Sequence, residues 1–183
     1  GISLDKWMDE NHFPKPKVAI GIIEQVAKGL ADFHKTETIH QDLKPGNILI
    51  NEDNKIKIVD FGSVFVSGLA EVFIPLEHEG VLGTATYSDP KYLLGKNTGI
   101  QGDLYALATI TYEVFCGKLP YGDKIEECQT AFEYDRLRYK SASDANPVIP
   151  MWFDRTLQRG VAFDLEERYD NINSFLRDLK NPN

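Results

Sequence analysis

Four polar residues in two short segments have the types and spacing that phosphoryl transfer needs. The segments read His40-Gln41-Asp42-Leu43-Lys44-Pro45-Gly46-Asn47 and, starting thirteen residues after Asn47, Asp60-Phe61-Gly62. The reaction requires an oxygen base beside the attacking hydroxyl, a cation at the transferred phosphoryl group and oxygen ligands for Mg²⁺. Asp42 can act as the base and Lys44 as the cation, and Asn47 with Asp60 can hold the metal.

The pattern, rather than any single residue, points to this chemistry. One aspartate in a loop is usually a turn residue or a helix cap, so Asp42 alone would indicate little. The order and spacing of Asp42, Lys44, Asn47 and Asp60 along the sequence indicate that the four residues act together in a functional site. We interpret His40 as a residue that braces the loop rather than as an acid–base group.

Two short strands and a long helix must position these residues. Strands are predicted at Ile48–Ile50 and Ile56–Val59, and they form a hairpin between the two segments. Before the loop, apolar residues recur at helical spacing and predict a long, buried helix. These apolar residues are Val18, Ile22, Val26 and Leu30.

The rest of the chain predicts further helices. One is expected over residues 3–10, with Ser3 as its N-cap and Asp5 in its first turn. Asp103 is expected to cap a helix over residues 104–116, which is apolar on nearly every side and therefore central. Helices are also expected within 123–140 and near 151–161 and 171–180, whereas 62–83 shows no sustained period.

Length, charge and cysteine content narrow the class of protein. The chain has 183 residues, 42% of them hydrophobic, which is enough for one domain with a substantial core. Its formal net charge of -8 argues against a nucleic-acid partner. Cys116 and Cys128 indicate neither a disulfide framework nor a zinc site, which fits a reducing cytoplasm. No apolar run in this chain is long enough to be a membrane segment.

Together, the motifs resemble the C-terminal lobe of a eukaryotic-like Ser/Thr protein kinase, and the resemblance covers residues 1–183. It implies a mainly α fold with a small β-hairpin at the catalytic loop, the cofactors ATP and Mg²⁺, and a protein substrate. In this family Asp42 would be the catalytic base, Lys44 would contact the γ-phosphate, and Asn47 and Asp60 would bind Mg²⁺. The position of Lys44 is more similar to that in Ser/Thr kinases than in tyrosine kinases.

The resemblance also implies residues around the nucleotide and the substrate. The run Gly83-Thr84-Ala85-Thr86-Tyr87-Ser88-Asp89-Pro90 looks like the substrate-facing segment. Within it, Thr84 would hydrogen-bond the catalytic aspartate and lysine. Leu49 would form the floor beneath the adenine, and Ser3 or Asp5 would contact the ribose.

Some structural residues of the family have counterparts here, and others do not. Asp103 resembles the buried aspartate that holds the catalytic-loop backbone, and Arg168 resembles the arginine that pairs with the acid ending the activation segment. That acid is usually a glutamate at the position of Lys91, so Asp89 is the nearby residue that could replace it. Gln41 stands where the family usually has an arginine.

The N-terminal lobe of the kinase fold has no counterpart in this sequence. A complete kinase domain needs about 250 residues, and no glycine-rich phosphate loop or Val-Ala-Ile-Lys strand is present. We therefore expect the chain to be the C-terminal lobe only, with the missing lobe as its partner. The sequence is also similar, at residues 146–154, 168–169 and 181–183, to bacterial bifunctional proteins that join a metal-dependent protein phosphatase domain to a kinase domain. A phosphatase domain is therefore another expected partner.

Two other functions compete with a protein kinase. A pseudokinase or regulatory interaction module would keep the fold without turnover, but Asp42, Lys44, Asn47 and Asp60 are all present. A small-molecule phosphotransferase of the aminoglycoside-kinase type shares the loop from the aspartate to the asparagine. The Asp60-Phe61-Gly62 turn and the substrate-facing segment favour a protein substrate instead.

Overall fold

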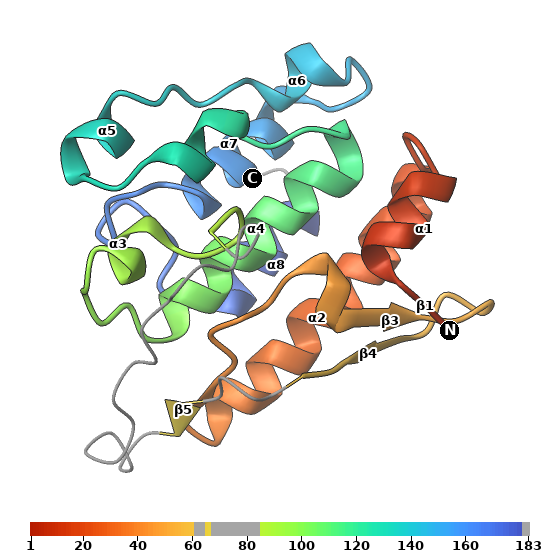
Figure 1. The fold of residues 1–183 in the computed structure, drawn as a ribbon. Coiled ribbons are helices and arrows are strands. Elements are labelled where there is room, and N and C mark those ends of the chain that lie inside the picture. Colours follow the sequence, from red (N-terminus) through yellow and green to blue (C-terminus); the bar gives the residue numbers. More distant parts are fainter. Residues whose placement is uncertain (61–64, 67–84, 181–183) are drawn as a thin grey trace.

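The computed structural model describes residues 1–60, the backbone of residues 65–66, and residues 85–180. Helices predominate in the described residues (Figure 1), which confirms the mainly α fold class. They are α1 (Leu4–Glu10), α2 (Pro16–Lys35), α3 (Pro90–Leu93), α4 (Ile100–Cys116), α5 (Ala131–Asp135), α6 (Ala142–Ala145), α7 (Met151–Gly160) and α8 (Ile172–Lys180), with the 3-10 turns η1 (Pro45–Asn47) and η2 (Asp123–Glu127). None of these helices has the length and apolarity that crossing a membrane requires.

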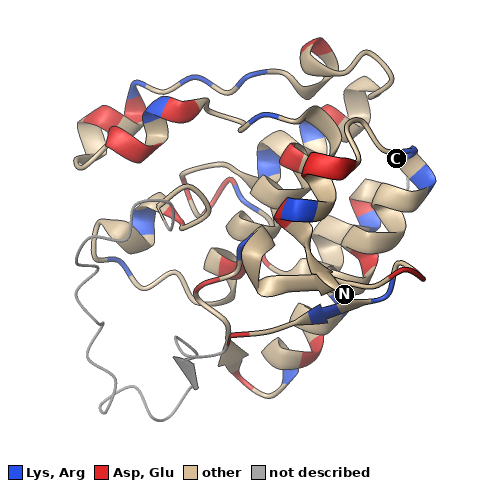
Figure 2. Cartoon of the chain, turned by 45° about the vertical axis from the view of Figure 1, so that its right-hand side comes forward, with Lys and Arg blue, Asp and Glu red and all other residues tan. Residues whose placement is uncertain are grey.

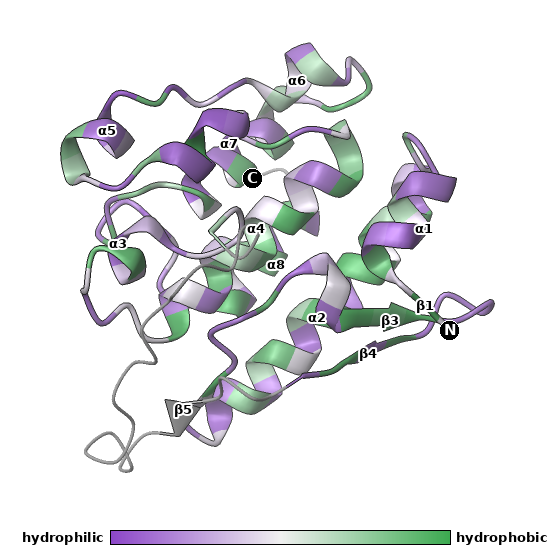
Figure 3. Cartoon of the chain, viewed as in Figure 1, coloured by the Kyte–Doolittle hydropathy of each residue, from purple (hydrophilic) through white to green (hydrophobic). Residues whose placement is uncertain are grey.

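A small antiparallel sheet carries the end of the catalytic loop. It contains β1 (Ile2–Ser3), β3 (Ile48–Ile50) and β4 (Ile56–Ile58) in the order β1-β3-β4. The predicted hairpin is confirmed, and its strand β3 is coloured as hydrophobic in Figure 3. A second ladder joins β2 (Thr38–Ile39) to β5 (Phe65–Val66), so the stretch expected to be irregular contains one short strand.

The central helix α4 holds the core together. Its side chains are buried on almost every face, as the sequence predicted, and it packs against both α2 and α7. Gly160 allows α7 to approach closely, because a Cβ at this position would lie 2.6 Å from the Ala108 Cβ. The apolar stripe of α2 is buried from Ala19 to Leu30, although Val18 is only half-buried. Charged residues of both signs are dispersed along the described chain (Figure 2).

One helix prediction was wrong in detail. The helix α4 begins at Ile100, with Gly99 at the N-cap position and a left-handed φ of 55°, so Asp103 is not its cap. The carboxylate of Asp103 is bonded elsewhere, as described below. The helix expected within 123–140 is confirmed as α5, which begins after Thr130, whose side chain accepts a hydrogen bond from the Glu133 amide.

Candidate active site

The catalytic loop brings three of the predicted residues together. Lys44 Nζ lies 3.7 Å from Asp42 Oδ2, and Asn47 Nδ2 donates a 2.8 Å hydrogen bond to the backbone carbonyl of Asp42. The Asp42 and Lys44 side chains are 20% and 30% exposed, whereas Asn47 is buried. A carboxylate and an ammonium group therefore lie side by side within reach of a ligand, and a buried amide fixes the loop that carries them.

Asp60 lies beside this loop because the end of β4 is bonded to it. The Val59 amide donates to the Asn47 carbonyl at 2.8 Å, and the His40 ring bonds the Val59 carbonyl at 3.2 Å. Asp60 is exposed and has a left-handed φ of 61°. A positive φ is uncommon for aspartate, and it persists where the surrounding structure imposes it. Asp60, the described residue of the second motif, thus lies beside the first motif.

His40 joins these segments through both ring nitrogens. The Asp42 amide donates to Nδ1 at 3.2 Å, so Nδ1 acts as an acceptor and carries no proton. The proton then resides on Nε2, which donates to the Val59 carbonyl. The residue is only 1% exposed. The interpretation that His40 braces the loop is confirmed.

Asp103 anchors the catalytic loop to α4. Its Oδ2 accepts from the His40 amide at 2.8 Å and is 2.8 Å from His34 Nε2, while its Oδ1 accepts from the Gln41 amide at 2.9 Å. Gln41 has a left-handed φ of 68°, a conformation that costs a non-glycine residue about 1–3 kcal/mol. The bonds to Asp103 hold the backbone in that conformation. The role implied by the kinase resemblance is confirmed, in place of the predicted helix cap.

The residues predicted to bind the nucleotide are only partly grouped. Ser3 and Leu49 are directly opposite one another in the β1–β3 ladder. Ser3 occupies the N-cap position of α1, but its side chain makes no capping bond there. Asp5 is exposed on α1, and burial, the first cause, and then the charges of Glu113 and Asp5 raise the pKa of Tyr87 in the substrate-facing segment. Thr84 lies outside the described residues.

Two carboxylates hold the described part of the substrate-facing segment. Tyr87 donates a 2.7 Å hydrogen bond to Glu113 on α4, and Thr86 donates one to Glu126 on η2. Burial raises the pKa of Glu113, although the bond from Tyr87 opposes that change. Sequence reasoning missed both acids. Glu113 could have been noticed as a lone acid in an apolar helix, whereas nothing in the sequence distinguishes Glu126 from the other acids beside it.

A buried ion pair fixes the end of the same segment. Arg168 binds Asp89 with two parallel hydrogen bonds, and both residues are at most 3% exposed. The Arg168 guanidinium also donates to the carbonyls of Ala162, Gln101 and Phe163. Asp89 accepts from the Lys91 amide as the N-cap of α3. Asp89 therefore takes the pairing role that the family usually gives to a glutamate at position 91.

Residues 1–179, nearly the whole chain, match the family model of the protein kinase domain. The chain belongs to the protein kinase domain family. It is 29% identical over 180 residues to the serine/threonine-protein kinase PrkC of Bacillus subtilis and 26% identical over 179 residues to a probable serine/threonine-protein kinase PknB of Lactococcus lactis. It is also 29% identical over 183 residues to the serine/threonine-protein kinase PknL of Mycobacterium tuberculosis. Each match covers 98% of this chain, but only 27%, 28% and 44% of the respective relatives.

In this kinase domain, a magnesium site would need few protein ligands. No group of three or more His, Cys, Asp or Glu side chains gathers as a metal site within the described residues. Mg²⁺ is commonly held by one or two protein oxygens together with substrate phosphates. Asn47 and Asp60 fit this requirement, because the Asn47 Nδ2 is engaged by the loop and its Oδ1 stays available as a ligand.

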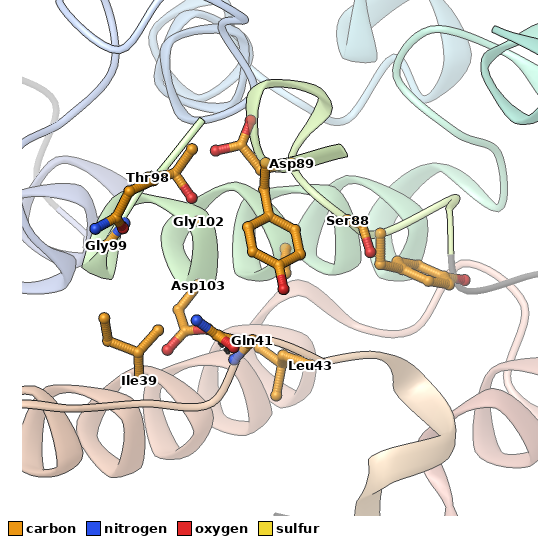
Figure 4. Close-up of a pocket in the computed structure, with 13 residues that line it drawn as sticks. Ile39, Gln41, Leu43, Ser88, Asp89, Thr98, Gly99, Gly102 and Asp103 are labelled. Carbon is orange, nitrogen blue, oxygen red and sulfur yellow. Dashed lines mark hydrogen bonds between the residues drawn. The ribbon is translucent and has the colours of Figure 1, made fainter. Parts of the chain in front are cut away.

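A small cavity separates Gln41 of the kinase domain from the end of the substrate-facing segment (Figure 4). Its volume of ≈ 20 Å³ is enough for one water molecule. Asp89 and Asp103 are its charged lining residues, and both are already paired or hydrogen-bonded. Among the described residues that line it, none is a lysine or an arginine.

Proposed function

We propose that residues 1–183 are the C-terminal lobe of a Ser/Thr protein kinase that transfers the γ-phosphate of ATP to a hydroxyl group of a protein. The observation that carries this proposal is the bonding of the end of β4 to the catalytic loop, through the Val59 amide and the Asn47 carbonyl. That bond brings Asp60 beside Asn47. The relatives named above, which are serine/threonine-protein kinases, support the same function.

Each residue of the proposed site has a chemical task. Asp42 would orient the substrate hydroxyl and accept its proton, and Lys44 would offset negative charge on the transferred phosphoryl group. Asn47 and Asp60 would hold Mg²⁺, which neutralises charge on the phosphates when bound. Thr84 would connect the substrate-facing segment to the catalytic aspartate.

The proposed nucleotide site is incomplete without a second lobe. Leu49 would form the lower surface of the adenine pocket, and Ser3 or Asp5 would contact the ribose. We propose that a separate N-terminal lobe supplies the upper surface and a lysine that positions the phosphates. Because the reaction uses ATP and both cysteines are free, we also assign this lobe to the reducing cytoplasm.

Phosphoamino-acid analysis tests the proposed reaction. The full-length polypeptide that contains residues 1–183 should be incubated with Mg²⁺ and γ-labelled ATP, together with a generic protein substrate such as myelin basic protein. We expect label on serine or threonine. Label on tyrosine alone, or transfer only to a small molecule such as an aminoglycoside, would overturn the assignment.

Residues 1–183 alone should fold but transfer no phosphate. Positioning and electrostatic stabilisation supply nearly all of the catalysis in phosphoryl transfer, and the glycine-rich loop and the lysine that position the phosphates would be missing. Calorimetric titration with Mg²⁺-ATP should therefore show no binding at micromolar concentrations, while the full-length kinase titrated in parallel should bind. Micromolar affinity or stoichiometric autophosphorylation of the isolated chain would contradict this expectation.

Gln41 should make the full-length kinase independent of phosphorylation in its activation segment. An arginine at this position would place a positive charge that a phosphate could neutralise, which is an electrostatic switch. Gln41 is neutral, and no lysine or arginine lines the adjacent cavity among the described residues. Kinase treated with a phosphatase should therefore keep most of its activity.

The substitution Gln41→Arg provides the matched comparison for this prediction. It restores the charge, so activity of the variant should fall after phosphatase treatment and recover on rephosphorylation. Strong activation of the unsubstituted kinase by a phosphate on Thr84, Thr86 or Ser88 would count against the proposed role of Gln41.

A further inference from the structure

An apolar groove lies between α2, α7 and α8, on elements that carry none of the proposed catalytic residues. Its volume is ≈ 330 Å³, within the range of ligand-binding pockets. The walls include Ile20 from α2, Phe115 from the end of α4, Trp152 from α7 and Leu179 from α8. Lys180 is the one charged residue among the described residues that line it.

The rim of this groove exposes large apolar side chains. Val148, which lines the groove, is 71% exposed, and Met151, which stands between the lining residues Pro150 and Trp152, is 60% exposed. A small molecule inside the hollow would leave the outer parts of both side chains in water. A polypeptide segment that lies across the groove would cover them, so the rim favours a macromolecular ligand.

The secondary structure of the groove limits how such a segment can bind. Its lining residues belong to helices α2, α4, α7 and α8 and to the loop before α7, and none belongs to a strand. An added β-strand therefore has no exposed backbone edge to pair with. An amphipathic helix can bind such a surface through side chains alone, with apolar residues spaced along one face.

The charges around the groove indicate which flanking residues the helix should have. Lys15 and Lys17 adjoin the lining residue Pro16, and both are exposed. Neither forms an ion pair with a carboxylate among the described residues, whereas Lys180 pairs with Glu24 at 2.8 Å. A chain of net charge -8 thus carries two lysines, exposed and unpaired in the described part of the structure, directly before and after the lining residue Pro16. Complementary charge in a partner would speed association and fix its orientation.

We propose that the groove between α2, α7 and α8 binds an amphipathic helical segment of a partner polypeptide, with apolar residues on one face and acidic residues beside them. Val148 and Met151 pack against the apolar face of this segment. Lys15 and Lys17 face its acidic residues. The site is separate from phosphoryl transfer and serves to recruit the partner.

Selection from a random peptide library displayed on phage tests the proposal. Residues 1–183 serve as bait, phage that bind the support alone are removed, and the variant Val148→Asp is kept for the later titration. Val148 is largely exposed, so the substitution should leave the fold intact, which circular dichroism can check. Enriched peptides should carry two or more apolar residues at helical spacing with acidic neighbours. The absence of enriched peptides, or enrichment of basic ones, would overturn the proposal.

Titration of a selected peptide then locates its site. Trp152 lines the groove and Trp7 does not, so in a Trp7→Phe background the fluorescence of Trp152 reports binding. Val148→Asp should weaken binding about tenfold or more. The matched control is Phe132→Asp, which removes a 69% exposed apolar side chain from α5 and should change affinity less than about twofold.

The charge argument has its own variant. Lys15→Glu combined with Lys17→Glu should weaken binding of the acidic peptide and reduce its dependence on salt. The proposed site would be overturned if the two lysine substitutions left the affinity unaltered. It would also be overturned if Phe132→Asp lowered the affinity as much as Val148→Asp does. If Val148→Asp left the binding unchanged, the ligand would occupy only the hollow of the groove, and this result would also overturn the proposal.

Discussion

In the proposed full-length kinase, the substitution Asp42→Asn should lower the rate of phosphoryl transfer by about 10²-fold or more, the lower end of what a positioned proton acceptor contributes. This corresponds to a barrier higher by about 2.7 kcal/mol. The change should affect chemistry and not the loop, because Asn47 bonds the backbone carbonyl of Asp42 and not its carboxylate. Nucleotide affinity, measured by calorimetry, should be nearly unchanged.

A matched control separates this effect from a general loss of charge. Asp53 is exposed in the turn between β3 and β4, so Asp53→Asn removes one carboxylate without touching the proposed site. Its rate should equal that of the unsubstituted kinase. If Asp42→Asn phosphorylates protein at the normal rate in a purified assay, Asp42 is not the catalytic base.

Breaking the buried ion pair should cause the largest loss of stability. Removal of one partner from such a pair costs about 3–5 kcal/mol, because the other charge is left buried and unpaired. Here Asp89→Asn leaves the Arg168 guanidinium in place, and the carbonyls of Ala162, Gln101 and Phe163 still accept from it. We therefore expect a loss near the lower end, about 3 kcal/mol, in the free energy of unfolding measured with urea.

The choice of substitution distinguishes the ion pair from the helix cap. Asparagine at position 89 can still accept from the Lys91 amide, so Asp89→Asn keeps the N-cap of α3, whereas Asp89→Ala should cost about 1 kcal/mol more. Asp123→Ala, at an exposed acid, should have little effect. A loss below about 1 kcal/mol for Asp89→Asn would show that the pair behaves like an exposed one.

The order of elements around the catalytic loop could be predicted because local signals agree with the fold. The apolar stripe of α2, the hairpin after Asn47 and the apolar sequence of α4 each specify one element without reference to distant residues. The same holds for Asp42, Lys44 and Asn47, which lie so close in sequence that one loop must group them. Contacts between residues that are far apart in the sequence could not be predicted from these local patterns.

Asp103 shows where local rules fail. An aspartate before an apolar run favours a helix cap, but three partners from α2 and the catalytic loop bind its carboxylate, and the helix begins one turn earlier. Contacts of this kind, more than sixty residues apart along the chain, leave no periodic signal. The strands β1 and β2 are two residues each, too short for an alternating pattern to be recognised.

The attachment of the catalytic loop to Asp103 also has a consequence for how the molecule comes apart. Irregular loops usually open at little cost, independently of the core. Here the amides of His40 and Gln41 bond a carboxylate that is 1% exposed on the most buried helix, so the loop cannot open without breaking bonds to α4. The loop and the core therefore form one cooperative unit, and the geometry of Asp42 should persist until α4 itself loses its packing.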